Sequence, residues 1–157
     1  NFVRFFSKRM LRFTQFYNCA RCVPTRQAFM SGLYPHQVTT VRSITLAEVL
    51  RLAGYRTLMT GKWHGMRKLP TQRGFDRYYG VISGSCNFFN PGLRRPREPE
   101  PAKDHGKARP FAIDGKVFKP YTPEDPDWYA SDAFTDVALQ YLDEYRDEDR
   151  PFFLFVS

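Results

Sequence analysis

The spacing of apolar residues divides much of the chain into short helices and strands. Between residues 45 and 54 the apolar positions recur at intervals of three and four, as on one face of a helix. Thr45 and Glu48 have the spacing of an N-terminal capping box, and Gly54 suits the end of the helix. The predicted buried stripe consists of Leu46, Val49, Leu50 and Ala53.

Three further segments predict β-strands. Residues 12–17 are rich in aromatic side chains, residues 56–60 follow the first helix directly, and residues 152–156 are an unbroken apolar run. Such a run is typical of a buried parallel strand. A second helix is predicted between the last two strands, over residues 131–145. Its apolar stripe consists of Phe134, Val137, Ala138, Tyr141, Leu142 and Tyr145.

Helices alternate with these strands, which favours an α/β domain layered around a mainly parallel sheet with helices on both faces. A short helix is also expected over residues 24–31, because Pro24 suits a first helical turn and Gly32 a helix end. Residues 90–127 hold most of the prolines and few aliphatic side chains. They predict a long, variable surface excursion with a small hairpin at Asp114 and Gly115. The length suits one domain, residues 1–157.

Composition excludes several classes of protein. Apolar residues make up 42% of the 157 residues, with 15 Phe and 9 Tyr, so we expect a packed core rather than disorder. No stretch approaches the roughly 20 apolar residues that span a bilayer, so no membrane span is expected. The sequence lacks an initiator Met and ends inside the predicted strand 152–156. We therefore expect a segment truncated at both ends.

Charge is distributed unevenly along the chain. Residues 1–80 carry 14 Lys and Arg against 2 acidic residues, a net of +12, whereas residues 81–157 carry 10 against 14, a net of −4. A basic half favours a nucleic acid, a membrane surface or a small anionic substrate as partner, and a solvated basic face is the alternative. The Arg residues are spread over predicted helices and strands without a nucleic-acid-binding motif, so a nucleic acid is disfavoured.

Cys22 stands directly before a predicted helix, where backbone N–H groups and the helix dipole favour negative charge. Arg26, one helical turn further on, can point back to the same place. Such a site suits a thiolate, an oxyanion or a bound sulfate. The alternative is a small residue packed at a strand–helix junction, with Arg26 in solvent. Cys19 and Cys22 form a single CxxC with no His at finger-like spacing, so a zinc or redox site is only weakly indicated.

The longer sequence around Cys22 resembles the first signature of the formylglycine-dependent (type I) sulfatases. Cys22, Pro24 and Arg26, continuing to Gly32, fit the CxPxR pattern and the small residue and glycine that follow it in this family. The preceding residues 13–18 are similar to the lead-in of bacterial arylsulfatases.

A second match follows in the expected order. Residues 54–64, which end in Gly-Lys-Trp-His, resemble the second sulfatase signature. Thr60 departs from it, at a position that is not expected to carry chemistry. Residues 69–76 resemble the family's LPxxxGFD stretch, and residues 132–136 with 151–154 resemble the helix and strand that come next. The resemblance covers nearly the whole chain outside the excursion.

This resemblance implies an alkaline-phosphatase-like fold, here a partial three-layer sandwich, and a sulfuric ester hydrolase. In this family a separate formylglycine-generating enzyme oxidises the signature Cys to an aldehyde, whose hydrate attacks the sulfur of a sulfate ester. Cys22 is then the nucleophile precursor and, once modified, a metal ligand, while Arg26 helps to hold the hydrated aldehyde. Lys62 is expected to bind the sulfate oxygens, and His64 to bind the substrate and move protons. The alternative interpretation is that Lys62 is a solvated side chain and that His64 is a structural residue at the end of a strand.

The resemblance also implies one calcium ion per site, with its other protein ligands outside this sequence. The 157 residues alone are therefore expected to be inactive. A periplasmic or secreted location is favoured by the resemblance. Two alternatives keep the same scaffold, namely a non-catalytic interaction module and a phosphate-ester hydrolase of the same superfamily. The second is disfavoured because such enzymes usually carry Ser or Thr at the nucleophile position.

Overall fold

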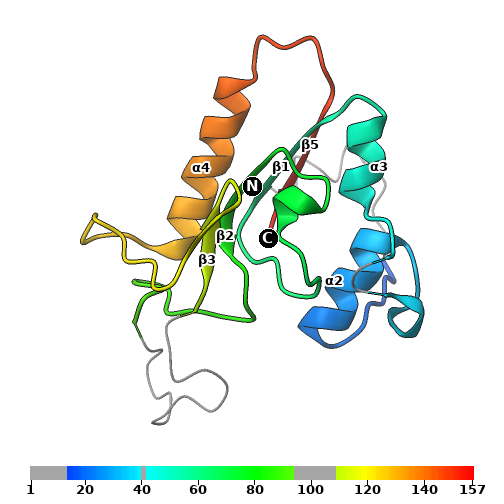
Figure 1. The fold of residues 1–157 in the computed structure, drawn as a ribbon, viewed down its shortest axis with the longest axis horizontal. Coiled ribbons are helices and arrows are strands. Elements are labelled where there is room, and N and C mark those ends of the chain that lie inside the picture. The colour runs from blue at the N-terminus through cyan, green and yellow to red at the C-terminus, as the bar shows by residue number, and fades with distance from the viewer. Residues whose placement is uncertain (1–13, 40–41, 94–108) are drawn as a thin grey trace.

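The computed structural model describes residues 14–39, 42–93 and 109–157 of the chain. Its helices and strands are α2 Cys22–Ser31, α3 Leu46–Leu52, β1 Arg56–Thr60, β2 Arg77–Val81, β3 Phe111–Ile113, β4 Lys116–Phe118, α4 Ala130–Glu144 and β5 Phe152–Val156, with 3₁₀ turns at Pro35–Gln37 and Pro70–Gln72. The five strands form one sheet in the order β4-β3-β2-β1-β5. In Figure 1, α4 lies on one side of this sheet and α2 and α3 lie on the other.

The sheet is parallel where the predicted strands lie and antiparallel at one edge. β1 pairs parallel with both β2 and β5, and Leu58 faces Arg77 on one side and Leu154 on the other. The β3–β4 hairpin adds to β2 antiparallel, so the sheet is mixed. The prediction of an α/β layered domain is confirmed, because parallel strands with crossover helices place helices on both faces.

Successive strand residues point to opposite faces and so supply two separate cores. Leu58 and Met59 are adjacent in β1 and both fully buried, yet they belong to different cores. The core on the α2 and α3 side contains Met30, Ala47, Met59, Trp63, Met66, Phe75, Tyr78 and Ala112. The core on the α4 side contains Leu58, Tyr79, Val81, Cys86, Phe111, Trp128, Ala130 and Tyr141. The three-layer arrangement therefore follows from residue alternation in the strands.

The predicted capping box of α3 is present. Thr45 Oγ1 accepts a hydrogen bond from Glu48 N at 3.1 Å, and Glu48 Oε2 accepts one from Thr45 N at 2.7 Å. The predicted buried stripe is wrong at Val49, which is 52% exposed, and at Ala53, which is also exposed, because α3 packs through Ala47. A Cβ built on Gly74 would lie 2.3 Å from Glu48 N. The start of α3 thus approaches Gly74 backbone to backbone, and a side chain at position 74 would not fit that contact.

The other two helices lie close to their predicted positions. α2 begins at Cys22, two residues before the predicted start, and ends at Gly32, which has φ 69°. α4 begins at Ala130 and buries Ala138 and Tyr141, two members of its predicted stripe. None of the helices that the structure describes is long and apolar enough to cross a membrane.

Residues 12–17 do not form the predicted strand where the structure describes them. Residues 12 and 13 lie outside the described residues, and residues 14–17 have irregular backbone. Phe16 is 79% exposed and Tyr17 is 87% exposed. A strand requires a neighbour for its backbone N–H and C=O groups, and this segment is paired with no strand of the described sheet.

Two further expectations need correction. β5 has its predicted bounds but is an edge strand of the described sheet rather than a buried one, and Phe152 and Val156 are more than half exposed. Its apolar side chains contact helices on both faces, but only β1 pairs with its backbone. The excursion 90–127 is not wholly superficial, because Phe111 in β3 is fully buried against β2. The predicted hairpin at Asp114 and Gly115 is confirmed.

We expect Leu58→Ala to lower the free energy of unfolding by about 2–5 kcal/mol, because it opens a cavity in the central strand. Leu52→Ala is the control, since Leu52 is 90% exposed and its loss removes little burial. Urea unfolding of the full-length variants measures both effects. Equal destabilisation by the two substitutions would contradict the assignment of β1 to the core.

Candidate functional site

The chain leaves β1 along a fixed path that carries Lys62 and His64. Lys62 N donates to Ser157 O at 3.1 Å, beyond the end of β5. His64 N donates to Ile82 O at 3.1 Å, beyond the end of β2. Backbone hydrogen bonds to both neighbouring strands thus hold this segment at the carboxyl edge of the sheet, where open α/β sheets place their ligands.

Glycines allow the strand ends to meet this closely. A Cβ on Gly80 would lie 1.9 Å from Gly61 O, and a Cβ on Gly61 would lie 1.8 Å from Ser157 O. Gly61 also has φ 94°, which side chains disfavour. Tyr78, fully buried, donates from its hydroxyl to Gly61 O at 3.0 Å. The turn after β1 is therefore fixed by both backbone and side-chain contacts.

Arg26 reaches from α2 to the ends of β1 and β5. Its Nη1 donates to Lys62 O and to Ser157 Oγ, each at 2.6 Å. Gln27 Nε2 donates to Gly65 O at 2.8 Å, so two consecutive side chains attach the helix to the 62–65 segment. Burial lowers the pKa of the Arg26 guanidinium, although Cys22 and Tyr78 oppose this shift. Arg26 is therefore not the solvated side chain of the alternative interpretation.

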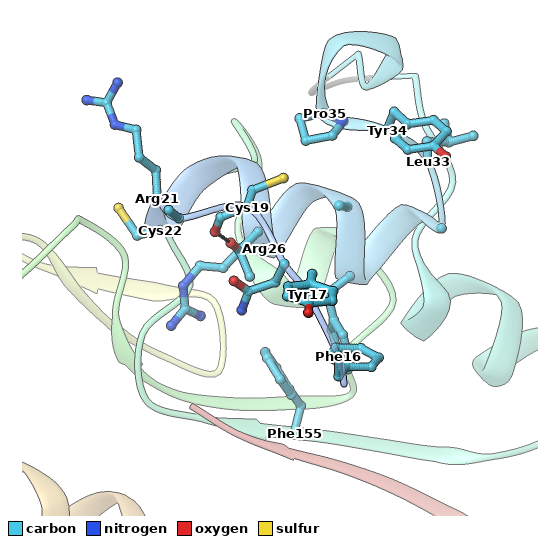
Figure 2. A pocket seen from close by; sticks show the side chains of 16 residues that line it. Phe16, Tyr17, Cys19, Arg21, Cys22, Arg26, Leu33, Tyr34, Pro35 and Phe155 are labelled. Carbon is cyan, nitrogen blue, oxygen red and sulfur yellow. Dashed lines mark hydrogen bonds between the residues drawn. The ribbon is translucent and has the colours of Figure 1, made fainter. Parts of the chain in front are cut away.

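Cys22 occupies the first turn of α2 as an exposed free thiol. Arg21, the N-cap residue, provides no side-chain cap, so the first N–H groups of the helix keep their attraction for negative charge. Thr25 Oγ1 donates to Cys19 O, which fixes the connection into the helix. Figure 2 shows Cys22 and Arg26 at the same end of α2.

A cavity of about 980 Å³ lies along the same helix. Cys22 and Arg26 line one end of it, and much of the remaining wall is apolar, including Phe16, Tyr17 and Phe155 (Figure 2).

His64 has an unusual backbone and an unusual environment. Its φ is 37°, a left-handed value that is uncommon outside glycine and that recurs at functional sites. A Cβ on Gly84 would lie 3.0 Å from Cε1, closer than ordinary van der Waals contact, so the imidazole packs tightly against this glycine. Nδ1 is buried and has no hydrogen-bond partner among the described residues. Burial, followed by the charges of Lys62 and Arg26, lowers the pKa of His64.

The structure thus brings Arg26, Lys62 and His64 together, with Cys22 one helical turn from Arg26. Arg26 and Lys62 are positively charged, so this group of residues suits an anionic ligand. Within the described ranges no three His, Cys, Asp or Glu side chains form a group able to hold a metal ion. A calcium ion needs six to eight oxygen ligands. The described residues alone do not fit the calcium ion that the resemblance implies.

Comparison with known proteins settles the ancestry. The sequence model of the sulfatase family matches residues 3–157. The chain belongs to the sulfatase family. It is 32% identical to arylsulfatase G of Rattus norvegicus over 162 residues, which cover 90% of this chain and 27% of that protein. It is 28% identical to an uncharacterised sulfatase of Schizosaccharomyces pombe, covering 96% of this chain and 31% of that protein.

Solved structures of sulfatases share the fold. The crystal structure of i-CgsB in complex with a neocarrahexaose superimposes with a TM-score of 0.62 and 28% identity, over 85% of this chain and 33% of that one. The PsFucS1 sulfatase from Pseudoalteromonas sp. gives a TM-score of 0.66 at 20% identity, over 90% and 34% of the two chains, which shows the fold alone. The alkaline-phosphatase-like fold is confirmed, and the chain spans about a third or less of these sulfatases.

Sequence reasoning missed two residues that shape the site, Ser157 and Gly84. Ser157 holds Arg26, and its position directly after an apolar strand is a signal for a residue at the ligand-binding edge. Gly84 makes room for His64. Gly84 lies in the loop that follows β2. The sequence analysis did not predict β2, so it could not predict that this loop lies beside the second signature.

We expect Lys62→Met to raise the pKa of His64, because one of the two cations that disfavour imidazolium is removed. The exposed Lys116, on β4, provides the control Lys116→Met, which should leave this pKa unchanged. Titration of the imidazole by NMR on the full-length protein measures the shift.

The depressed pKa has a consequence for stability. The unfolded chain binds the His64 proton more readily, so the contribution of His64 to stability is present above pH 6.5 and is lost as the pH falls through the folded pKa. For the Lys62→Met variant, an unchanged pKa of His64 would contradict the finding that the Lys62 ammonium lies close to the His64 imidazole.

Proposed function

We propose that this protein is a sulfuric ester hydrolase of the arylsulfatase type, in which Cys22 is converted to formylglycine. The observation that carries the proposal is the meeting of the two signature segments at one edge of the sheet, through the hydrogen bond from Arg26 to Lys62 O at 2.6 Å. A formylglycine-generating enzyme is the proposed maturation partner, and Cys22 is an exposed free thiol.

The proposed reaction uses the two hydroxyls of the hydrated aldehyde. One hydroxyl loses its proton and attacks sulfur, forming an O–S bond while the S–O bond to the alcohol breaks and the alcohol leaves with a proton. The second hydroxyl then loses its proton, the C=O bond re-forms, and the C–O bond to sulfate breaks. Water restores the hydrate, so the net reaction is hydrolysis. An unmodified thiol has no equivalent release step.

Each residue of the site has a role that its environment supports. Lys62 balances the charge on the sulfate oxygens, and the uncapped N–H groups of α2 add to this field. Burial and the nearby cations lower the pKa of His64, which favours the neutral imidazole, the form that can take up a proton in the release step. Arg26 orients the modified Cys22 from its fixed position on Lys62 O and Ser157 Oγ.

The remaining expectations extend this proposal to the whole protein. We expect residues 1–157 to form part of the N-terminal catalytic domain and to be inactive alone, because the resemblance places the other ligands of the family's calcium ion outside this sequence. Formylglycine at position 22 is the ligand that this segment contributes. A calcium ion, once bound, would supply positive charge to the site. A periplasmic or secreted location remains our expectation.

Modification of Cys22 can be tested by mass spectrometry. The full-length protein is co-expressed with a formylglycine-generating enzyme, and the peptide that contains Cys22 should show the mass change for conversion of CH₂SH to CHO. Cys22→Ala should abolish hydrolysis of 4-nitrophenyl sulfate, whereas Cys19→Ala, the matched control, should retain it. An unmodified Cys22 under conditions that convert another sulfatase would contradict the nucleophile assignment.

The role of Lys62 predicts a kinetic effect without a folding effect. Lys62→Met should lower kcat on 4-nitrophenyl sulfate by about 10²–10³, as for loss of one preorganised charge-stabilising group. Lys116→Met should have wild-type kcat. Steady-state kinetics with a thermal melt of each variant provides the test. Equal kcat values in the two variants would remove Lys62 from the reaction.

A further inference from the structure

Three aromatic rings stand exposed in the loop that follows β2 and at the start of α4. Phe88 is 58% exposed, Phe89 69% and Tyr129 36%. The Tyr129 ring centroid lies 6.2 Å from that of Phe88 and 5.4 Å from that of Phe89, so the rings form one group. We call these three residues the aromatic platform. Contiguous apolar surface of this kind commonly marks a binding site.

The loop that carries the platform is held by hydrogen bonds. Asn87 Oδ1 accepts from Phe89 N at 2.9 Å and from Asn90 N at 3.2 Å. Phe88 O accepts from Ala130 N at 2.8 Å, which joins the loop to the start of α4. These bonds fix the backbone beneath all three rings. A ligand would therefore meet preorganised ring faces, which lowers the entropy lost on binding.

The platform lies on the same edge of the sheet as the anion-binding residues. Gly84 contacts the His64 imidazole, and Phe88 follows four residues later. Four residues span at most about 14 Å, which limits the separation. Figure 1 shows α4 running in the opposite direction to β5, so α4 starts on the side where the parallel strands end. Cys22 approaches this edge from the α2 side and the platform from the α4 side.

We propose that the aromatic platform binds the organic part of the sulfate ester and selects esters that carry a ring. The inference rests on the proposed function, which places the sulfate at Lys62 and His64. Aromatic faces bind other rings through offset or edge-to-face contact, beyond the burial that any apolar group provides. Aryl and pyranose rings share this chemistry, because each presents a flat face with C–H groups. A linear alkyl group does not.

Kinetics of full-length Phe88→Ala, Phe89→Ala and the double variant test this proposal. The substrates are 4-nitrophenyl sulfate, a pyranose 6-sulfate and a linear alkyl sulfate. For at least one ring-bearing ester we expect the double variant to raise KM by roughly threefold to tenfold with kcat unchanged. KM for the alkyl sulfate should not change. Leu52→Ala is the matched control, because it removes an exposed apolar side chain from α3.

The outcomes separate the platform from the reaction. An effect on the aryl or on the pyranose ester identifies the ring that the platform prefers. The same rise in KM for the alkyl sulfate, or no rise for any ester, overturns the proposal. If the wild-type protein hydrolyses none of the three, the proposed function fails. In that case, saturation-transfer NMR with phenol and a methyl pyranoside tests ring binding by the aromatic platform independently of hydrolysis. Signal lost in the double variant but kept in Leu52→Ala supports ring binding, and equal signal in both overturns it.

Discussion

The site depends on one place where three backbones meet without side chains between them. Gly80 of β2 lies against Gly61, and Gly61 lies against Ser157 beyond β5. A methyl group at position 80 or 61 would force the strand ends apart, because each built Cβ falls within 2 Å of a carbonyl oxygen. Lys62 and His64 leave the sheet at this junction. Lys62 O, which accepts the hydrogen bond from Arg26, also lies at this junction. The packing of the sheet edge and the attachment of α2 therefore depend on the same steric constraint.

Elements with a strong local signal could be predicted from the sequence, and elements that depend on neighbours could not. The capping box determined α3, and the bounds of β1 and β5 matched their sequence runs. β2 was missed because Arg77 and Gly80 interrupt its apolar pattern, and its burial comes from strands on both sides. Residues 14–17 have strand-forming side chains but no paired strand. Propensity for a strand is largely a preference for a pleated, half-buried surface, and that surface is supplied by the rest of the fold.

The candidate site shows the same division. The signatures named Cys22, Arg26, Lys62 and His64, because residue type and spacing are local information. They did not reveal how Arg26 is held, since its partners lie 36 and 131 residues away along the chain. The left-handed backbone of His64 and its contact with Gly84 were also hidden. A motif identifies which side chains meet, whereas their protonation and orientation depend on contacts made only in the folded protein.

Electrostatics links binding at this site to proton transfer. Burial lowers the pKa of His64, and the charges of Lys62 and Arg26 add to this effect. An anion bound between these groups would oppose both positive charges and so raise the same pKa. His64 would be neutral before the sulfate ester binds and easier to protonate once the anion is present. Because binding and protonation are linked, each must favour the other by the same free energy. Beside two cations, and with an Nδ1 that has no hydrogen-bond partner among the described residues, His64 thus has a proton affinity that depends on the occupancy of the site.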